Sequence, residues 1–154
     1  MQVYLGNYNI PNDNDASYDR QKTEILQVIQ AYGDKNIAGI TVGNEYILKW
    51  VTFYDLPYLW LISPSYILQN GGGPANGPAG DQGAALLIPN IDDTRTTIQG
   101  MNLNIPIGNA DAGAYFNNKV LAAIDYGVRT IFPCFILDIK NGNRWPMYIH
   151  GLAA

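Results

Sequence analysis

The sequence alternates short apolar runs with longer segments of helical periodicity, and this order constrains the fold more than any other feature. The apolar runs are 3–8, 37–42, 103–111 and 128–137, and the periodic segments are 17–33, 82–101 and 112–127. Elements in this order form successive right-handed crossover units, in which the strands lie parallel in one sheet. We therefore predict an α/β fold with a parallel sheet.

Local signals define the ends of these elements. Ser17 can cap the first helix and Gly33 can end it, and the apolar residues between them return to one face. Gly127 is expected to end the third helix. Pro89 lies inside the second helix and should kink or break it, because proline donates no backbone hydrogen bond. The run 37–42 is apolar on both faces, as expected for a parallel strand that helices cover.

The composition is that of one domain with a substantial core, since the chain has 154 residues and 47% of them are hydrophobic. The net charge of −4 comes without a cluster of Lys or Arg, so neither nucleic acid nor a membrane surface is expected as a partner. No run is long enough to span a bilayer, and the first residues lack the pattern of a signal peptide. Eleven Tyr and three Trp suit sugar stacking and an ordinary tyrosine-rich core equally well.

Two of the predicted strands end in similar polar sequences, "TVGNE" and "IGNADA". Each places Gly-Asn and then an acidic residue just past the carboxyl end of a strand, which gives Asn44, Glu45 and Asp111 as candidate site residues. In a barrel of parallel strands, active sites are built at that end. The alternative is that these side chains only satisfy turns or cap helices, a common role for Asn and Asp.

Other candidate sites are weaker. Cys134 and His150, the only cysteine and the only histidine, could be imagined as a nucleophile and its base, but no third residue orients the imidazole. The same lone histidine makes a metal site improbable, and we expect no metal and no cofactor. The run "NGGGPANGPAG" lacks the lysine of a phosphate-binding loop, so we interpret it as a flexible connection.

Three stretches, "GITVGNEYIL", "GDQGAALLIPNIDDTR" and "IPIGNADAGAYFNNKVLAAIDYG", resemble fungal members of glycoside hydrolase family 17, which includes β-1,3-glucanases and glucanosyltransferases. The resemblance implies a partial (β/α)8 TIM barrel, with barrel strands three to six in a single domain spanning 1–154. It also implies that Glu45 is the general acid/base of a retaining mechanism and that Asn44 contacts sugar hydroxyls.

Asp111 follows the next predicted strand and would open on the same face as Glu45, and Tyr115 could line the sugar cleft, so both are candidate substrate-binding residues. Two alternatives stay open for them. Asp111 could instead bond within the network at the strand ends or start the next helix, and Tyr115 could pack in the core. A retaining glycosidase needs a second carboxylate about 5 to 5.5 Å from the acid/base. The family nucleophile belongs to a "TGWP"-like motif, and the corresponding "RWPMY" carries no acid.

Other parts of the chain depart from the family. Where relatives have "HPWF", this sequence has "FPCF" at 132–135. The segment 51–69 resembles nothing in the family; its 19 codons can start with GT and end in AG, so we interpret it as a translated short intron. The tail from residue 136 is also divergent.

Two functions follow from these observations. The first is a retaining β-1,3-glucan hydrolase, acting on β-glucan or an oligosaccharide outside the cell or in the cell wall, as the resemblance implies. The second is a half-barrel that binds glucan or has a structural role without turnover, which the missing nucleophile favours. A half-barrel leaves open sheet edges, so self-association is also expected.

Overall fold

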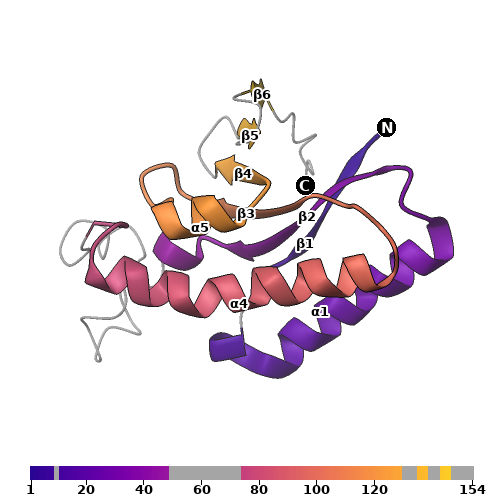
Figure 1. The fold of residues 1–154 in the computed structure, drawn as a ribbon, viewed down its shortest axis with the longest axis horizontal. Coiled ribbons are helices and arrows are strands. Elements are labelled where there is room, and N and C mark those ends of the chain that lie inside the picture. The colour runs from indigo at the N-terminus through magenta and orange to yellow at the C-terminus, as the bar shows by residue number, and fades with distance from the viewer. Residues whose placement is uncertain (9–10, 49–73, 130–134, 139–142, 147–154) are drawn as a thin grey trace, which may run out of the picture.

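The chain forms one six-stranded sheet with helices against it (Figure 1). The computed structural model describes residues 1–8, 11–48, 74–129, 135–138 and 143–146. The strands are β1 (Val3–Asn7), β2 (Ile37–Asn44), β3 (Ile107–Asp111), β4 (Tyr126–Arg129), β5 (Phe135–Asp138) and β6 (Asn143–Pro146), and they lie in that order across the sheet. The first four are parallel, and β5 and β6 continue the sheet in antiparallel orientation.

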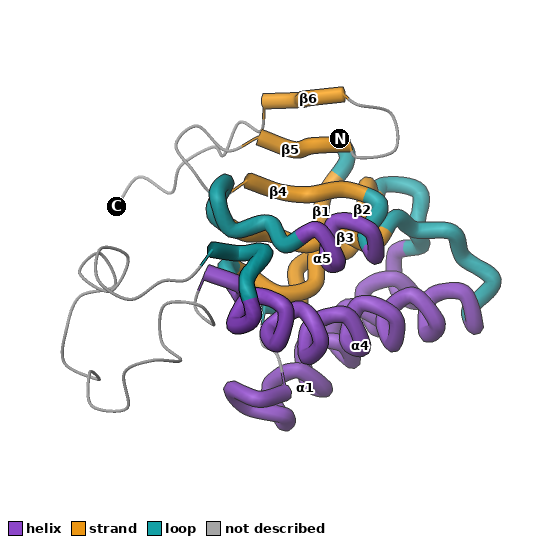
Figure 2. Tube along the Cα trace, turned by 60° about the vertical axis from the view of Figure 1, so that its left-hand side comes forward, coloured by secondary structure: helices purple, strands orange, loops and turns teal. Residues whose placement is uncertain are grey.

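In the part of the chain that the structure describes, three helices lie beside this sheet (Figure 2): α1 (Pro11–Tyr32), α4 (Pro78–Gly100) and α5 (Asn118–Ala123). All three contribute to one apolar cluster with Ile40, Val42 and Ile107, so they cover the same face of β2 and β3. Consecutive parallel strands whose described crossover helices all lie on one face are the arrangement of a (β/α) barrel section, whereas a doubly wound sheet has helices on both faces. The predicted α/β class is confirmed.

The helix-covered face, defined by Ile40, Val42 and Ile107, is closely packed. All three side chains are fully buried, as are Leu87 and Ile91 of α4. Branched aliphatic side chains in this position remove apolar area from water at about 25 cal/mol per Å², which is the main favourable term in folding. This face therefore contains the core of the domain.

The opposite face, called here the inner face, is built on glycine. Gly39 of β2 and Gly108 of β3 lie beneath the ring of Tyr126, and a Cβ atom at either glycine would fall 2.5 Å from a ring carbon. The Tyr126 hydroxyl shares a hydrogen bond of 2.8 Å with Thr41 Oγ1. The Tyr4 ring lies 5.0 Å from that of Tyr126 between centroids. Glycine is needed in these strands because it allows a ring to lie directly on the backbone.

The two long helices differ from the prediction in their bounds. The first begins at Pro11 instead of Ser17, because proline suits the first turn, where its missing N–H would be unpaired in any case. The second runs without a break through Pro89. Pro89 and Ala85, whose carbonyl loses its donor, are both exposed, so water can replace the missing hydrogen bond. The buried residues on either side hold the helix together.

The run "NGGGPANGPAG" is not simply a flexible connection. Its last three residues, 78–80, form the first turn of α4. Ala75 is buried, and Gly80 packs so closely on it that a Cβ atom would lie 1.9 Å from the Ala75 carbonyl oxygen. The interpretation is wrong for residues 74–80, and the earlier part of the run lies outside the described residues.

The third helix and the fourth strand are also corrected. The helix is limited to Asn118–Ala123, because the Asn117 side chain caps its start and the Asp125 N–H bonds to the Ile107 carbonyl as strand pairing begins. Gly127 is a residue of β4 and does not end a helix. The predicted strand 128–137 contains part of two strands, β4 and β5, which pair antiparallel. An apolar run indicates strand residues but not the reversal between them.

Some expectations fall outside the described residues, namely those on the segment 51–69, on Cys134 and on His150. Of the tail from residue 136, the structure describes residues in the antiparallel strands β5 and β6. Among the described helices, none is long and apolar enough to cross a membrane. Over the same part of the chain, His, Cys, Asp and Glu form no group of three that could hold a metal ion.

Candidate functional site

The end of β2 contains an irregularity that changes which way its last residue faces. Thr41 is aligned with Gly108 of β3, but Asn44 is aligned with Ala110, so β2 uses three steps where β3 uses two. The extra residue is accommodated at Gly43, whose φ of 77° favours glycine. Side chains of aligned residues in a parallel pair share a face, so Asn44 lies on the inner face with Thr41 and Ala110. A regular strand would put it on the helix-covered face.

Glu45 follows immediately, in a backbone conformation that is costly for its residue type. Its φ is 53°, in the left-handed region, where a residue other than glycine costs roughly 1 to 2 kcal/mol. Its N–H donates to the Ala110 carbonyl at 2.8 Å, so the turn is held by β3. The side chain is half-buried. Conformations of this kind gather at functional sites, where the surroundings hold them in place.

Asp111 at the end of β3 is fully buried, and backbone N–H groups bond to both of its oxygens. Oδ2 accepts from Ile47 N at 2.9 Å, and Oδ1 accepts from Ala112 N at 2.9 Å and Leu48 N at 3.3 Å. It therefore caps the helical turn that starts after Glu45. Burial raises its pKa to about 7, the nearby Glu45 carboxylate also raises it, and the three backbone donors act in the opposite direction.

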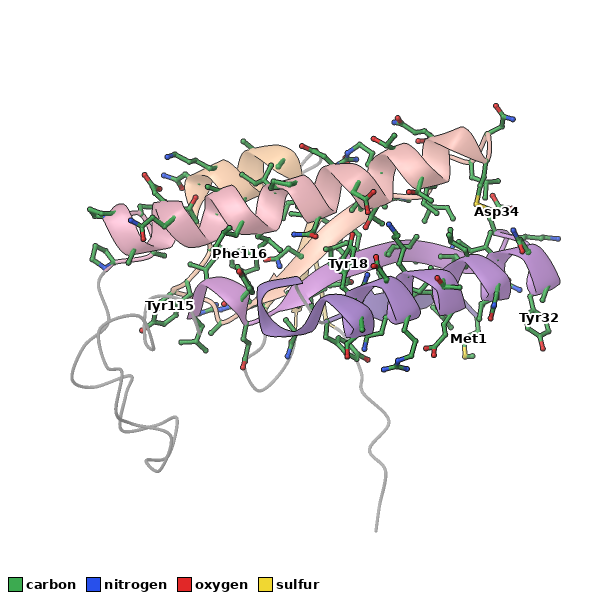
Figure 3. All side chains as sticks on the ribbon, turned by 90° about the horizontal axis from the view of Figure 1, so that it is seen from below. Met1, Tyr18, Tyr32, Asp34, Tyr115 and Phe116 are labelled. Carbon is green, nitrogen blue, oxygen red and sulfur yellow. The ribbon has the colours of Figure 1, made fainter. Side chains whose placement is uncertain are left out.

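Tyr115 lies in the turn that follows β3, at the end of the molecule where β2 also ends (Figure 3). Its N–H donates to the Ala112 carbonyl at 2.8 Å. The side chain is half-buried and packs against the main apolar cluster, so it contributes to the core and still has exposed surface. Both readings of Tyr115, a core residue and a site residue, are compatible with this position.

A polar network fixes the same turn to the start of α4. Asn117 is fully buried; its Nδ2 donates to the Ala75 carbonyl at 2.6 Å and to Asp81 Oδ1 at 3.0 Å, and its Oδ1 accepts from Lys119 N. Lys119 Nζ also reaches Asp81, and the hydrogen bonds from Lys119 and Asn117 lower the pKa of the Asp81 carboxyl. The loop that carries Tyr115 is thus held at both ends.

Three polar residues near this edge were not singled out from the sequence. Asn109 is fully buried and donates to the Val42 carbonyl at 2.8 Å, directly before the extra residue of β2, while its Oδ1 has no partner. Asn7 at the end of β1 is similar: it donates to the Tyr18 carbonyl at 3.5 Å and its Oδ1 is unpaired. Arg129 at the end of β4 packs over Gly113. The sequence signal that could have indicated these three residues is a polar side chain within or at the end of an apolar strand.

The ends of β2 and β3 thus bring the Asn44 amide and the Glu45 carboxylate together, and the buried carboxylate of Asp111 lies close to Glu45. Glu45 is the accessible acid. Asp111 is near enough for its pKa to respond to the Glu45 charge, but its oxygens are occupied by backbone donors and its side chain is out of contact with solvent. At the carboxyl ends of β1 to β4, as far as the structure describes them, the arrangement supplies one acid that can exchange a proton with a ligand.

Two known proteins to which the chain is similar are both named as enzymes of β-1,3-glucan. No protein-family model matches the chain. Over 150 residues it is 23% identical to a protein of Aspergillus niger named "Putative glucan endo-1,3-beta-glucosidase btgC", a match that covers 94% of this chain and 17% of that protein. The chain therefore spans about a sixth of the length of this curated relative. The similarity does not establish membership of glycoside hydrolase family 17.

One solved structure also matches, an active-site mutant of Rhizomucor miehei β-1,3-glucanosyltransferase in complex with laminaritriose. The TM-score is 0.45 and the sequence identity is 19%, over 82% of this chain and 35% of that one. The barrel-section assignment therefore depends on the strand order and the helix placement described above.

Proposed function

We propose that the chain carries the acid/base half of the active site of a retaining β-1,3-glucan-active glycosidase of the family 17 type. The observation that carries the proposal is the end of β2, where the extra residue turns Asn44 onto the inner face and Glu45 adopts a left-handed backbone. These features lie at the carboxyl ends of parallel strands, where barrel enzymes have their active sites. The A. niger relative, named as a glucan endo-1,3-β-glucosidase, supports the same substrate.

In this proposal Glu45 protonates the glycosidic oxygen as its bond to the anomeric carbon breaks, and later takes a proton from the attacking water. Asn44 binds a sugar hydroxyl beside the bond. Asp111 acts as a positioning residue, because it holds the turn after Glu45 through Ile47 and Leu48. Tyr115 lines the sugar site from the neighbouring turn. A β-1,3-glucan substrate of this kind would be met outside the cell or in the cell wall.

A second function, glucan binding without turnover, is favoured by one observation. A retaining mechanism needs a second carboxylate that attacks the anomeric carbon, and Asp111 is too buried for that role. We therefore expect that the chain alone binds laminaritriose and releases no reducing sugar from laminarin above the level of a Glu45→Gln variant. Release that Glu45→Gln abolishes would contradict this and would promote Asp111 to a reacting group.

External azide distinguishes the two functions. Azide can occupy the place of the missing nucleophile and form a glycosyl azide, while Glu45 gives its proton to the leaving sugar oxygen. If the chain carries a working acid/base, incubation with a laminari-oligosaccharide and azide yields this product, and Glu45→Gln abolishes it. Glu24→Gln is the matched control, because Glu24 is an exposed carboxylate on α1 paired with Arg20. Binding without any azide product would favour the second function.

A further inference from the structure

Tyr8 is an exposed aromatic residue whose ring lies against the backbone at Gly6. It follows β1 directly and is 59% exposed. A Cβ atom on Gly6 would lie 2.6 Å from Tyr8 Cε1, 3.2 Å from Cζ and 3.3 Å from Cδ1, so the ring folds back over that glycine. Only glycine, which has no side chain, leaves room for the ring at this position. The ring is therefore held on one side and open to solvent.

The ring lies on the same face as Asn44. Gly6 is aligned with Thr41 of β2, so the position above Gly6 belongs to the inner face. Asn44 was turned onto that face by the extra residue of β2. Because β1 and β2 are parallel neighbours, Tyr8 and Asn44 lie at the same edge of the sheet as well as on the same face. Tyr8 plays no part in the core, since it belongs to neither apolar cluster of the described residues.

We propose that Tyr8 is a sugar-stacking residue, which positions one glucose unit of a β-1,3-glucan chain beside Asn44 and Glu45. The inference rests on the proposed function, because it takes the same ligand and the same strand edge. The axial C–H bonds of a β-linked glucose unit form an apolar surface that suits an open aromatic face. A ring already fixed by Gly6 loses little conformational freedom on binding, which favours affinity. The Tyr8 hydroxyl is not required in this arrangement.

The test is laminaritriose binding by the full chain, measured by calorimetry for the parent, for variants of Tyr8, Gly6 and Tyr32, and for Asn44→Ala and Glu45→Gln. We expect Tyr8→Ala to weaken binding about tenfold, the size of one aromatic contact, and Tyr8→Phe to bind like the parent. Gly6→Ala keeps Tyr8 but adds a methyl group at the place where the ring lies, so the ring has to move. This variant should therefore weaken binding by several fold. Tyr32→Ala is the control, because Tyr32 is 84% exposed at the far end of α1. Thermal melts confirm that each variant is folded.

The outcomes separate this inference from the proposed function. If Asn44→Ala and Glu45→Gln weaken binding but Tyr8→Ala and Gly6→Ala do not, the stacking role is overturned and the proposed function stands. If the parent chain does not bind laminaritriose, both are overturned. If Tyr8→Phe weakens binding as much as Tyr8→Ala, the contact is made by the hydroxyl, and the stacking role is wrong.

Discussion

The two faces of the sheet are built from different residues on the same strands. On the helix-covered face, Ile40, Val42 and Ile107 are fully buried and fill the space beneath α1 and α4. On the inner face, Gly39 and Gly108 leave room for the Tyr126 ring, while Tyr4 and Tyr8 keep large exposed surfaces. The helix-covered face removes apolar area from water, whereas on the inner face aromatic rings lie against the backbone of glycine residues.

This difference indicates which face is available for a ligand. A side chain buried among aliphatic neighbours can change only at a cost in stability, so the helix-covered face is constrained by folding. The exposed rings of the inner face contribute less to the core and can take part in binding. The comparison can be tested because adjacent residues of one strand, Ile107 and Gly108, belong to opposite faces.

The largest expected effect is on the helix-covered face. Ile107→Ala should lower the free energy of unfolding by about 2 to 5 kcal/mol, because it removes a fully buried side chain and leaves a cavity. Urea unfolding of the parent and the variant measures the change. Val28→Ala on α1 is the control; Val28 is exposed, so a change within about 0.5 kcal/mol is expected. A similar loss for both variants would mean that this face is not the core.

The next effect concerns Asp111, the buried acid of the helix-covered side. Its pKa of about 7 in the folded chain lies above the ordinary value of 3.8. Between these two pH values the unfolded chain releases the proton and the folded chain keeps it, so rising pH favours unfolding. Relative to an Asp111→Asn variant, the parent should therefore lose up to about 4 kcal/mol of stability as the pH rises from 4 to 7.

Paired urea melts of the parent and Asp111→Asn at several pH values measure this difference. Because both chains share every other titrating group, the subtraction isolates Asp111. A parent that instead gains stability over the variant with rising pH would show that the backbone donors of Ile47, Leu48 and Ala112 dominate, and that the folded pKa lies below 3.8.

The smallest effect tests the requirement for glycine on the inner face. Gly108→Ala should destabilise the chain by about 1 to 3 kcal/mol, because the new methyl group would lie 2.5 Å from the Tyr126 ring and forces it to move. Gly100→Ala at the end of α4 is the matched control, since no atom lies within 4 Å of its added carbon. That variant should be neutral or stabilised by up to about 1 kcal/mol. Equal effects of the two substitutions would show that the inner face does not require glycine at position 108.

The fold class could be predicted because apolar runs and helical periods are local properties of the sequence. β2 was found as a continuous apolar run, and its middle residues are all buried. α4 was found by its helical period, and its buried residues repeat at helical spacing. The continuity of α4 through Pro89 could not be predicted, because it depends on which side of the helix faces solvent. The separation of β4 from β5 depends on a pairing between distant residues, and no local pattern contains it.

The candidate site could be predicted only in part. Asn44 and Glu45 were found because they follow a buried strand, and Asp111 was found by the same reasoning. Whether Asp111 faces a ligand or the backbone was not readable, since its partners, Ile47 and Leu48, lie more than 60 residues earlier. Tyr8 was assigned to a strand and not to a site, because its orientation depends on the glycine two residues before it.

The antiparallel pair β5 and β6 has a consequence for how copies of the chain could assemble. Among the described strands, β1 and β6 are the two outer strands of the sheet, and they do not pair with each other. Two copies joined through β1 alone would share a two-fold axis, which makes a closed dimer in which each copy uses the same surface. Contact between β1 of one copy and β6 of the next would use unlike surfaces, and it can repeat without limit unless the rotation closes a ring. The predicted self-association would therefore show by its symmetry which strand edge is exposed.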